Sequence, residues 1–432
     1  MTVAVTGGTW LLAAELARIP RVGGGPIIEL LILVASLLTY ASGWLLLCGE
    51  SRLTALRAGA TTLTLVALLG VAELAALFGL VDYAHVWSVA SGEWTGPATS
   101  FVSDPVLAWS RPPHEAWSGR PRSDMSVAFN LSVRAPRWQS FTTDARGFRN
   151  RRDRDRAEVA LVGDSYIEGA YVSDEETAAE DLEQQTGWSV ENLGRSGYGT
   201  LQELEVVRLY ALPLHPRAVA WFFFEGNDLY DDETYENALA YLREDGSFEK
   251  AESRAADLSR FREASLSVNG FRLLRRALDP LVPVGAASFG LFREPGGAAV
   301  KLYFYRDAAL RFDEYEERRF AKTQDALRRG AELLREHQVR LLLVFIPSKF
   351  RVYGNRCDFP NGSPCAAWHL WDLESRFERF CAASDLALLD LTGPMRAAAA
   401  AGQILYAPED SHWNAQGHRF VAELLAASAS LR

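Results

Sequence analysis

From residue 158 onward, short apolar segments alternate with amphipathic ones, and this alternation limits the possible folds more than any other feature of the chain. The apolar segments 158–163, 188–194, 217–228, 339–347 and 386–391 have the character of strands, and the segments 174–187, 200–212, 313–338, 368–383 and the one from Asn414 that of helices. Strands that alternate with helices form parallel sheets covered by helices on both faces. The pattern therefore predicts an α/β domain over residues 158–432.

Two regions depart from this alternation. Residues 229–312 are mixed in character, and we expect an insertion over the sheet edge that can act as a lid. Residues 83–157 are irregular and end in a charged run, 149–158, which is typical of a solvated connection. We therefore expect this second region to be a linker in front of the domain.

The N-terminal region, residues 1–82, contains two long apolar segments. Residues 26–48 contain Glu29 as their one charged residue, and residues 59–81 contain Glu73 as theirs. A membrane span needs roughly 20 such residues, and core helices of this length seldom lack charge. We expect a hairpin of two transmembrane helices joined by a loop at residues 49–58.

The charges that flank these segments indicate the topology of the chain. The flank after the second apolar segment has no Lys or Arg before Arg111, whereas the loop carries Arg52 and Arg57. Positive residues are enriched in cytoplasmic loops. The expected protein is therefore integral to the membrane, with its C-terminal domain outside the cytoplasm, in the periplasm or on the cell surface.

Composition argues against several classes of partner. The net charge is −10 without a concentrated basic region, so we expect no nucleic-acid partner. The seven histidines and four cysteines have no metal-site spacing, and we expect no metal. Cys357 and Cys365 flank a loop rich in turn-forming residues, and either a disulfide or two free thiols fits this pattern.

Polar residues follow the predicted strands at the points where each strand ends. Ser165 follows the first strand, Gly197 the second and Asn227 the third, while His412 precedes the last helix. Each has a structural alternative, since Ser165 can be a helix N-cap and the others turn or core residues. Because the carboxyl ends of parallel strands meet at one edge of a sheet, we expect all four to converge.

This set of side chains fits nucleophilic acyl transfer. A serine hydroxyl needs a base, for which His412 is the candidate, and a carboxylate must orient the imidazole, for which Asp410 is the candidate. An oxyanion needs fixed N–H donors, and the Ser165 amide, the Gly197 amide and the Asn227 side chain can supply them. Such chemistry needs no metal or organic cofactor.

The same residues resemble the SGNH (GDSL-type) hydrolase family over roughly residues 158–432. The four family blocks correspond to Gly163-Asp164-Ser165, Gly197 in "NLGRSGYG", Gly226-Asn227-Asp228, and His412, in the family's order. The resemblance implies a flavodoxin-like three-layer α/β/α sandwich with a parallel sheet. It also implies ester hydrolysis or acyl transfer to oxygen.

One departure from the family concerns the acid. The family usually places an aspartate three residues before the histidine, where this chain has Glu409, whereas Asp410 lies two before. The spacing D-x-H-W, and the segment "IPSKFRVY" at 346–353, are similar to the subgroup that includes the alginate O-acetylation proteins. We therefore expect Asp410 to be the acid, with Glu409 as the alternative.

The sequence thus predicts a membrane-anchored SGNH-type serine esterase that hydrolyses acyl esters, acetyl esters above all. The expected substrate is an acylated carbohydrate or lipid of the cell surface, and the sequence does not identify any protein partner. Two alternatives remain, an O-acyltransferase that modifies an exopolysaccharide and a non-catalytic glycan-binding protein.

Overall fold

A computed structural model describes residues 52–83, 86, 102–121, 123–129, 137–245, 265–270, 288–293, 297, 299–306 and 312–432. The chain divides into two compact units. Unit 1 comprises Met1–Thr95 and Ser247–Val284, and unit 2 comprises Gly96–Gly246 and Gly285–Arg432.

Unit 2 is built on a sheet of five parallel strands, as the alternation predicted. The strands are β5 (Val159–Gly163), β6 (Val190–Gly194), β7 (Ala218–Phe224), β10 (Arg340–Ile346) and β12 (Leu388–Asp390), and their order in the sheet is β12-β10-β7-β5-β6. Counted along the chain, this is the 2-1-3-4-5 order of flavodoxin-like doubly wound sheets. The order reverses between β5 and β7, and a crevice for ligands forms at such a reversal.

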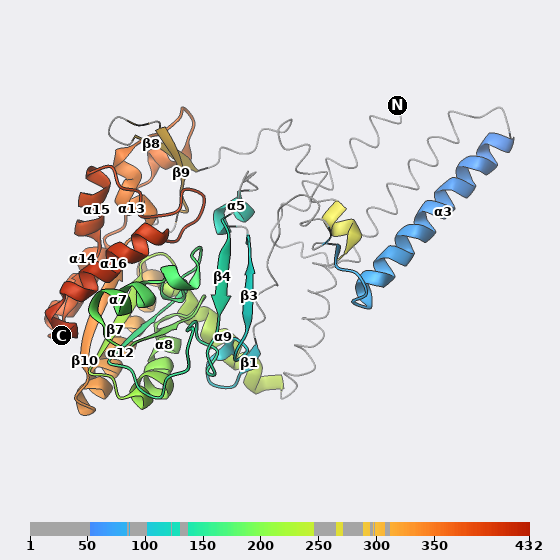
Figure 1. Ribbon diagram of the computed structural model, residues 1–432. Helices are drawn as coiled ribbons and strands as arrows, with labels where there is room; N and C mark the ends of the chain where they lie inside the picture. The colour runs from blue at the N-terminus through green and yellow to red at the C-terminus, as the bar shows by residue number, and fades with distance from the viewer. Residues whose placement is uncertain are drawn as a thin grey trace. The chain divides into compact units, whose positions relative to one another are not determined.

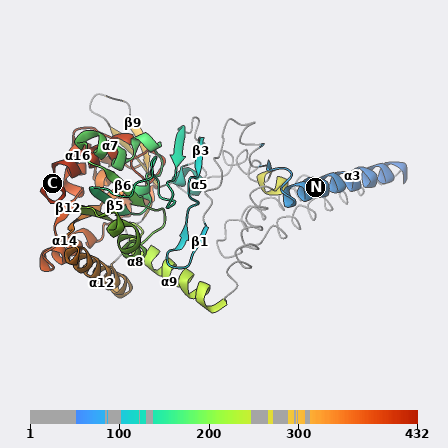
Figure 2. The ribbon, with the colours of Figure 1, turned by 60° about the horizontal axis from the view of Figure 1, so that its bottom comes forward.

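Helices cover both faces of this sheet (Figure 1). One face carries α7 (Ala178–Thr186), α13 (Lys349–Tyr353), α15 (Thr392–Ala400) and α16 (Ala415–Ala427), and the other carries α8 (Thr200–Val206), α12 (Glu314–Glu336) and α14 (Leu373–Ala383). Figure 2 shows α7 and α16 on one side of β5 and β6, with α8, α12 and α14 on the other. The sheet is therefore buried between two helical layers.

The central strand β7 shows why its sequence is continuously apolar. Ala220 and Phe222 pack into one core, and Trp221 and Phe223 pack into the other. Successive side chains of a strand point to opposite faces, so a strand covered on both faces has no solvent-facing positions.

Local signals at the helix ends match the predicted boundaries. The Asp313 side chain accepts hydrogen bonds from the backbone N–H groups at the start of α12, and Asn414 accepts one from Gly417 at the start of α16. Gly187 ends α7 with φ 72°, a left-handed conformation that suits glycine.

Most of residues 83–157, the segment predicted to be a linker, belongs to unit 2. It forms β1 (Val102–Asp104), β2 (Ala108–Ser110), β3 (Ala116–Gly119), α5 (Asp124–Ala128) and β4 (Gln139–Thr142). Arg149, which the sequence placed in a solvated run, is buried and donates hydrogen bonds to Asp174 Oδ1 at 2.8 Å and to Val172 O at 2.8 Å. Tertiary contacts of this kind leave no periodic pattern in the sequence.

The predicted insertion, residues 229–312, is divided between the units. α9 (Asp228–Asp245) belongs to unit 2, as do β8 (Phe289–Arg293) and β9 (Ala299–Tyr303), which form an antiparallel sheet with β11 (Cys357–Asp358). Residues 247–284 belong to unit 1. The insertion is therefore not a single lid.

Cys357, in β11, and Cys365 are free thiols. Of the two alternatives that the sequence left open, the structure thus has the unpaired one.

Unit 1 contains α3 (Arg52–Leu77), and its segment Gly59–Leu77 is the one stretch among the described residues that is long and apolar enough to cross a membrane. The helix begins inside the predicted loop at 49–58, because Arg52 and Arg57 are as compatible with a helix as with a turn. It ends at Leu77, before the end of the predicted span at Val81. The other predicted span, 26–48, lies outside the described residues. Glu73 of α3 is buried and accepts a hydrogen bond from Ser267 N at 2.6 Å.

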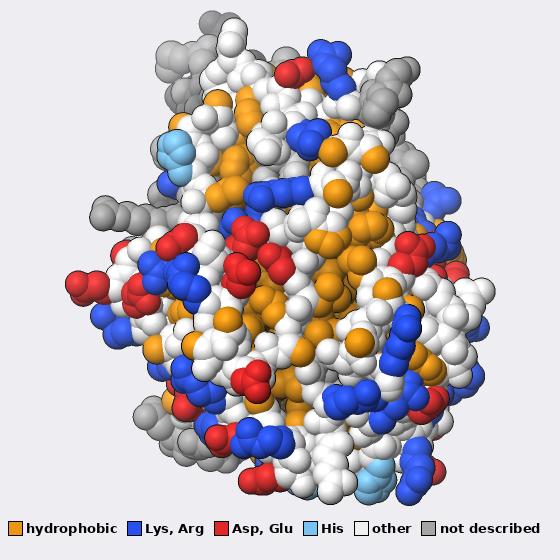
Figure 3. Space-filling model, turned by 90° about the vertical axis from the view of Figure 1, so that its left-hand side faces the viewer, with side chains coloured by type: hydrophobic (Ala, Val, Ile, Leu, Met, Phe, Trp, Pro, Cys, Tyr) orange, Lys and Arg blue, Asp and Glu red, His pale blue; other side chains and the backbone are white. Residues whose placement is uncertain are grey.

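Figure 3 shows the left-hand side of Figure 1, where α14, α15 and α16 lie. Lys and Arg side chains alternate on this face with Asp and Glu, and apolar side chains form a band between them. No continuous basic region is visible on the described part of this face.

The packing of α12 on the sheet leads to a stability prediction. A Cβ added at Gly330 would lie 2.3 Å from Cζ3 of Trp221, whose side chain is fully buried. We expect Gly330→Ala to lower the free energy of unfolding by about 1–3 kcal/mol, although alanine favours a helix over glycine. Thermal unfolding should show a melting temperature lower by a few degrees.

Gly393→Ala in α15 is the matched control, because a Cβ there meets no atom within 4 Å. It should leave the melting temperature unchanged or raise it. Equal behaviour of the two variants would contradict the described packing of α12.

Candidate active site

The four residues singled out in the sequence, Ser165, Gly197, Asn227 and His412, lie at one edge of the sheet. Ser165 opens α6 (Ser165–Glu168) directly after β5, Gly197 follows β6, and Asn227 follows β7. His412 lies in the loop before α16. The edge is the carboxyl end of the parallel strands, where the strand order reverses.

The start of α6 fixes the position of Ser165. Asp164, and not Ser165, is the N-cap, since its Oδ1 accepts a hydrogen bond from Tyr166 N at 2.9 Å. The helix packs closely on β6, and Gly194 makes this possible: a Cβ added there would lie only 2.3 Å from Glu168 N. Ser165 therefore occupies the first helical turn with its hydroxyl free of a capping role.

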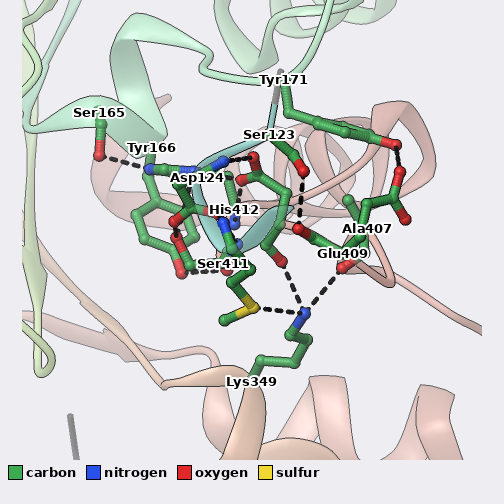
Figure 4. Close-up of polar contacts among 12 residues, drawn as sticks. Ser123, Asp124, Ser165, Tyr166, Tyr171, Lys349, Ala407, Glu409, Ser411 and His412 are labelled. Atoms are coloured by element: carbon green, nitrogen blue, oxygen red, sulfur yellow. Dashed lines mark hydrogen bonds and ion pairs between the residues drawn. The ribbon is translucent and has the colours of Figure 1, made fainter. Parts of the chain in front are cut away.

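A chain of hydrogen bonds joins the serine, the histidine and an aspartate. Ser165 Oγ lies 2.7 Å from His412 Nε2 (Figure 4), and His412 Nδ1 lies 2.6 Å from Asp410 Oδ1. The backbone N–H of His412 also donates to Asp410 Oδ1 at 3.0 Å. A hydroxyl, an imidazole and a carboxylate in this order form an arrangement that can activate a serine for nucleophilic attack.

The electrostatics of the pair favour the charged imidazole. Burial opposes the imidazolium, but the charge and hydrogen bond of Asp410, with contributions from Asp124 and Asp164, outweigh it and raise the pKa of His412 to about 9. Burial also acts to raise the pKa of Asp410, but the charge and hydrogen bonds of His412 lower it to about 2. Asp410 is therefore ionised, and its negative charge favours the protonated form of the His412 ring.

Glu409, the alternative acid, faces away from the histidine. Its Oε1 accepts a hydrogen bond from Tyr171 OH at 2.9 Å, and its backbone carbonyl accepts one from Ser123 Oγ at 2.8 Å. The geometry thus places the carboxylate two residues before the histidine, and not the one three before, on the imidazole.

Two backbone N–H groups are available at this edge. Among the described residues, neither Ser165 N nor Gly197 N donates a hydrogen bond. Gly197 has φ 78°, a conformation that favours glycine, and a Cβ there would lie 3.7 Å from Cζ2 of Trp109. Trp109 comes from β2 in the predicted linker, and no pattern in the sequence indicates its place beside Gly197.

Asn227 has one amide hydrogen bond and no described contact with Ser165. Its Nδ2 donates to Asp231 Oδ2 at 2.5 Å, while its Oδ1 is buried without a partner among the described residues. Burial, with the charges of Asp164 and Asp232, raises the pKa of Asp231 to about 8. The second hydrogen of the Asn227 amide is free to serve another acceptor.

Lys349 holds the loop that carries the acid and the histidine. It is buried and its Nζ donates to Ala407 O at 2.8 Å, Pro408 O at 3.2 Å and Asp410 O at 2.6 Å (Figure 4). Burial lowers its pKa to about 8, against the raising effect of neighbouring carboxylates. The segment "IPSKFRVY" was the only signal for this residue in the sequence.

The predicted linker also reaches this loop. Asp124 N–H donates to Asp410 Oδ2 at 2.9 Å, and Ser411 N donates to Asp124 Oδ1 at 2.9 Å. Sequence reasoning missed Asp124, because it lies in an irregular segment 286 positions before Asp410.

Asp124, Asp410 and His412 form the one group of potential metal ligands among the described residues, with one ligand atom from each lying within 4.8 Å of the others. Hydrogen bonds join Asp410 to both of the other residues. Asp410 thus accepts hydrogen bonds from the Asp124 backbone and the His412 ring, while the Asp124 carboxylate accepts hydrogen bonds from Ser411.

Comparison with protein families matches residues 302–432 to the family described as the SGNH hydrolase-like domain of acetyltransferase AlgX. This segment contains Lys349, Asp410 and His412. Comparison with curated proteins gives no match.

Several solved structures are similar to this chain at low identity. A lipolytic protein of the G-D-S-L family from Desulfitobacterium hafniense DCB-2 has 11% identity and a TM-score of 0.34, covering 63% of this chain and 98% of its own. The acetyl xylan esterase AlAXEase also has 11% identity and a TM-score of 0.34, covering 63% of this chain and 98% of its own. The lipase/acylhydrolase from Enterococcus faecalis has 12% identity and a TM-score of 0.32, covering 62% of this chain and 92% of its own.

We predict that the pKa values of two buried histidines, His412 and His418, are shifted in opposite directions. The ring of His412 should titrate well above the ordinary value of 6.5, near pH 9, whereas burial lowers the pKa of His418 to about 3 and keeps that ring neutral. Nitrogen NMR of the imidazole rings between pH 5 and 10 should show the transition of His412 and a His418 ring that stays neutral throughout.

Asp410→Asn should lower the midpoint of His412 and leave His418 unchanged. A His412 midpoint at or below 6.5 in the unaltered protein would contradict the described pairing.

Proposed function

We propose that this chain is an ester-acting enzyme of the SGNH hydrolase family, whose domain model matches residues 302–432. In this proposal Ser165 is the nucleophile, His412 the general base and acid, and Asp410 the carboxylate that orients His412. The observation that carries the proposal is the pair of hydrogen bonds, at 2.7 and 2.6 Å, that joins these three side chains. The donors and acceptors stand in the order that acyl transfer requires.

The reaction follows from this order. Ser165 Oγ attacks the acyl carbonyl carbon while its proton moves to His412 Nε2, and the carbonyl oxygen becomes an oxyanion. The tetrahedral intermediate collapses, the alcohol leaves with the proton from His412, and the acyl group stays on Ser165. Water then attacks the acyl-enzyme, again with His412 as base, and releases the acid and the free serine.

The oxyanion needs donors that are already in place. We assign this role to the N–H groups of Ser165 and Gly197 and to the second amide hydrogen of Asn227. The left-handed conformation of Gly197 and the hydrogen bond between Asn227 and Asp231 support the assignment, since they fix the two donors before substrate arrives.

For the substrate we propose acetyl esters of a cell-surface glycan or lipid. The description of the matched family as an acetyltransferase supports the acetyl group. Trp109, an aromatic side chain beside Gly197, supports an alcohol with an apolar face, such as a sugar ring.

We further propose that α3 anchors the enzyme in a membrane, with the active site outside the cytoplasm. Leu63 and Leu68 of α3 are 72% and 62% exposed, and an apolar surface of this kind favours a lipid environment. The absence of Lys and Arg directly after this segment supports the orientation.

A second candidate is transfer of the acyl group to a sugar hydroxyl instead of water. The description of the matched family specifically favours it. The two reactions share the acyl-enzyme and differ only in the acceptor that reaches it.

Removal of the nucleophile tests the proposal. The full-length protein in detergent is given an aryl acetate, and we expect Ser165→Ala and His412→Ala each to lower kcat/KM at least about 10³-fold. Release of the aryl alcohol measures the rate.

Ser384→Ala is the matched control, since Ser384 ends α14 ahead of β12, at the opposite edge of the sheet. It should keep the full rate. Unchanged hydrolysis in Ser165→Ala would contradict the proposal, and no turnover in the wild type would favour a protein that only binds glycans.

Added acceptors distinguish hydrolysis from transfer. If transfer is the reaction, oligosaccharides raise the rate of aryl alcohol release and gain acetyl groups, which mass spectrometry detects. If hydrolysis is the reaction, acetate equals the alcohol released and the oligosaccharides stay unmodified.

A further inference from the structure

Asp124 lies beside the proposed catalytic pair although it comes from a distant part of the chain. It is the first residue of α5, in the segment that the sequence predicted as a linker. Its backbone N–H donates to Asp410 Oδ2 at 2.9 Å, and Asp410 binds the His412 ring with its other oxygen. The backbone N–H of Asp124 thus binds the carboxylate oxygen of Asp410 that does not bind His412.

The Asp124 carboxylate approaches His412 from another side. Ser411 N donates to Asp124 Oδ1 at 2.9 Å, and Ser411 Oγ donates to Asp124 Oδ2. The same Ser411 Oγ lies 3.3 Å from His412 Nδ1. One oxygen of Asp124, one of Asp410 and a ring nitrogen of His412 all lie within 4.8 Å of one another.

The residues around Asp124 hold it in this place. Ser123 Oγ donates to Glu409 O at 2.8 Å, and Lys349 Nζ lies 3.6 Å from Met125 Sδ. Three consecutive residues of the segment therefore contact either the loop at 407–412 or the lysine that binds it. The segment completes the site from outside the parallel sheet.

From these contacts we infer that Asp124 is a second carboxylate of the charge-relay group, a positioning residue that orients His412 through Ser411 and adds its negative charge beside the imidazolium. The inference rests on the proposed function. Lys349, buried beneath the same loop, supplies the compensating positive charge for the two carboxylates. The charged and titratable groups around His412 are Asp410, Asp124, Asp164 and Lys349.

The sign of the effect on pH dependence follows from the charge. Negative charge at Asp124 raises the pKa of His412, so its removal lowers that pKa. His412 must be neutral to accept the serine proton, and the rate therefore rises with pH through its pKa. Loss of the Asp124 charge should move the midpoint of this rise to lower pH.

The test measures kcat and KM for an aryl acetate against pH in the full-length protein. We expect Asp124→Asn to lower the plateau kcat about tenfold with little change in KM, and to move the midpoint to lower pH. Asp104→Asn is the matched control, because Asp104 lies in the same segment and also accepts two backbone hydrogen bonds, but among the described residues both come from its own turn. Its midpoint should equal that of the wild type.

Ser411→Ala provides a second variant if Asp124→Asn fails to fold. It removes the hydroxyl between Asp124 and His412, and we expect a smaller loss of kcat and a smaller shift of the midpoint in the same direction. An unchanged midpoint in a folded Asp124→Asn protein, or in Ser411→Ala where that protein does not fold, overturns the inference. If Ser165→Ala retains the wild-type rate, the proposed function itself has failed, and the two failures are thereby distinguished.

Discussion

The hydrogen bond between the Asp410 carboxylate and the His412 ring is the interaction on which the rest of the site depends. Both groups are buried, and a buried imidazole gains a proton only where a negative charge compensates it. The loop that carries the pair has no regular structure of its own. Its backbone carbonyls instead bind the ammonium of Lys349, and its side chains bind Asp124. These contacts, together with the antiparallel bridge between Tyr406 and Trp413, hold the loop and its two side chains in place.

The parallel sheet supplies the other half of the geometry. Ser165 and Asn227 follow β5 and β7, the two neighbouring strands between which the order reverses. The connections leave this point toward opposite faces, and a crevice opens at the carboxyl ends. Gly194 lets α6 pack against β6, so the serine is held by backbone contacts as well as by its hydrogen bond to His412. The proposed nucleophile and the proposed base thus come from segments 247 positions apart in the chain.

The sequence predicted those parts of the structure that rest on local patterns. Continuous apolar runs such as 218–224 indicate strands buried on both faces, and caps such as Asp313 mark helix ends, because each signal lies within a few residues of the feature it specifies. Asp124 and Lys349 escaped prediction because their partners are distant in the chain and tertiary packing leaves no periodicity. The choice of Asp410 over Glu409 rested on the resemblance of D-x-H-W to a known subgroup, and the structure places the Asp410 carboxylate 2.6 Å from His412 Nδ1.

The most direct test of the central claim is to find the acyl group on the enzyme. The full-length protein is mixed with an aryl acetate, quenched in acid during steady turnover, digested, and its peptides are weighed by mass spectrometry. The account predicts an acetyl group on the peptide that contains Ser165, and its loss when the reaction is left to run to completion before the quench. Turnover with the acetyl group on a different residue, or with no acylated peptide at all under conditions where acylation outpaces deacylation, would contradict it.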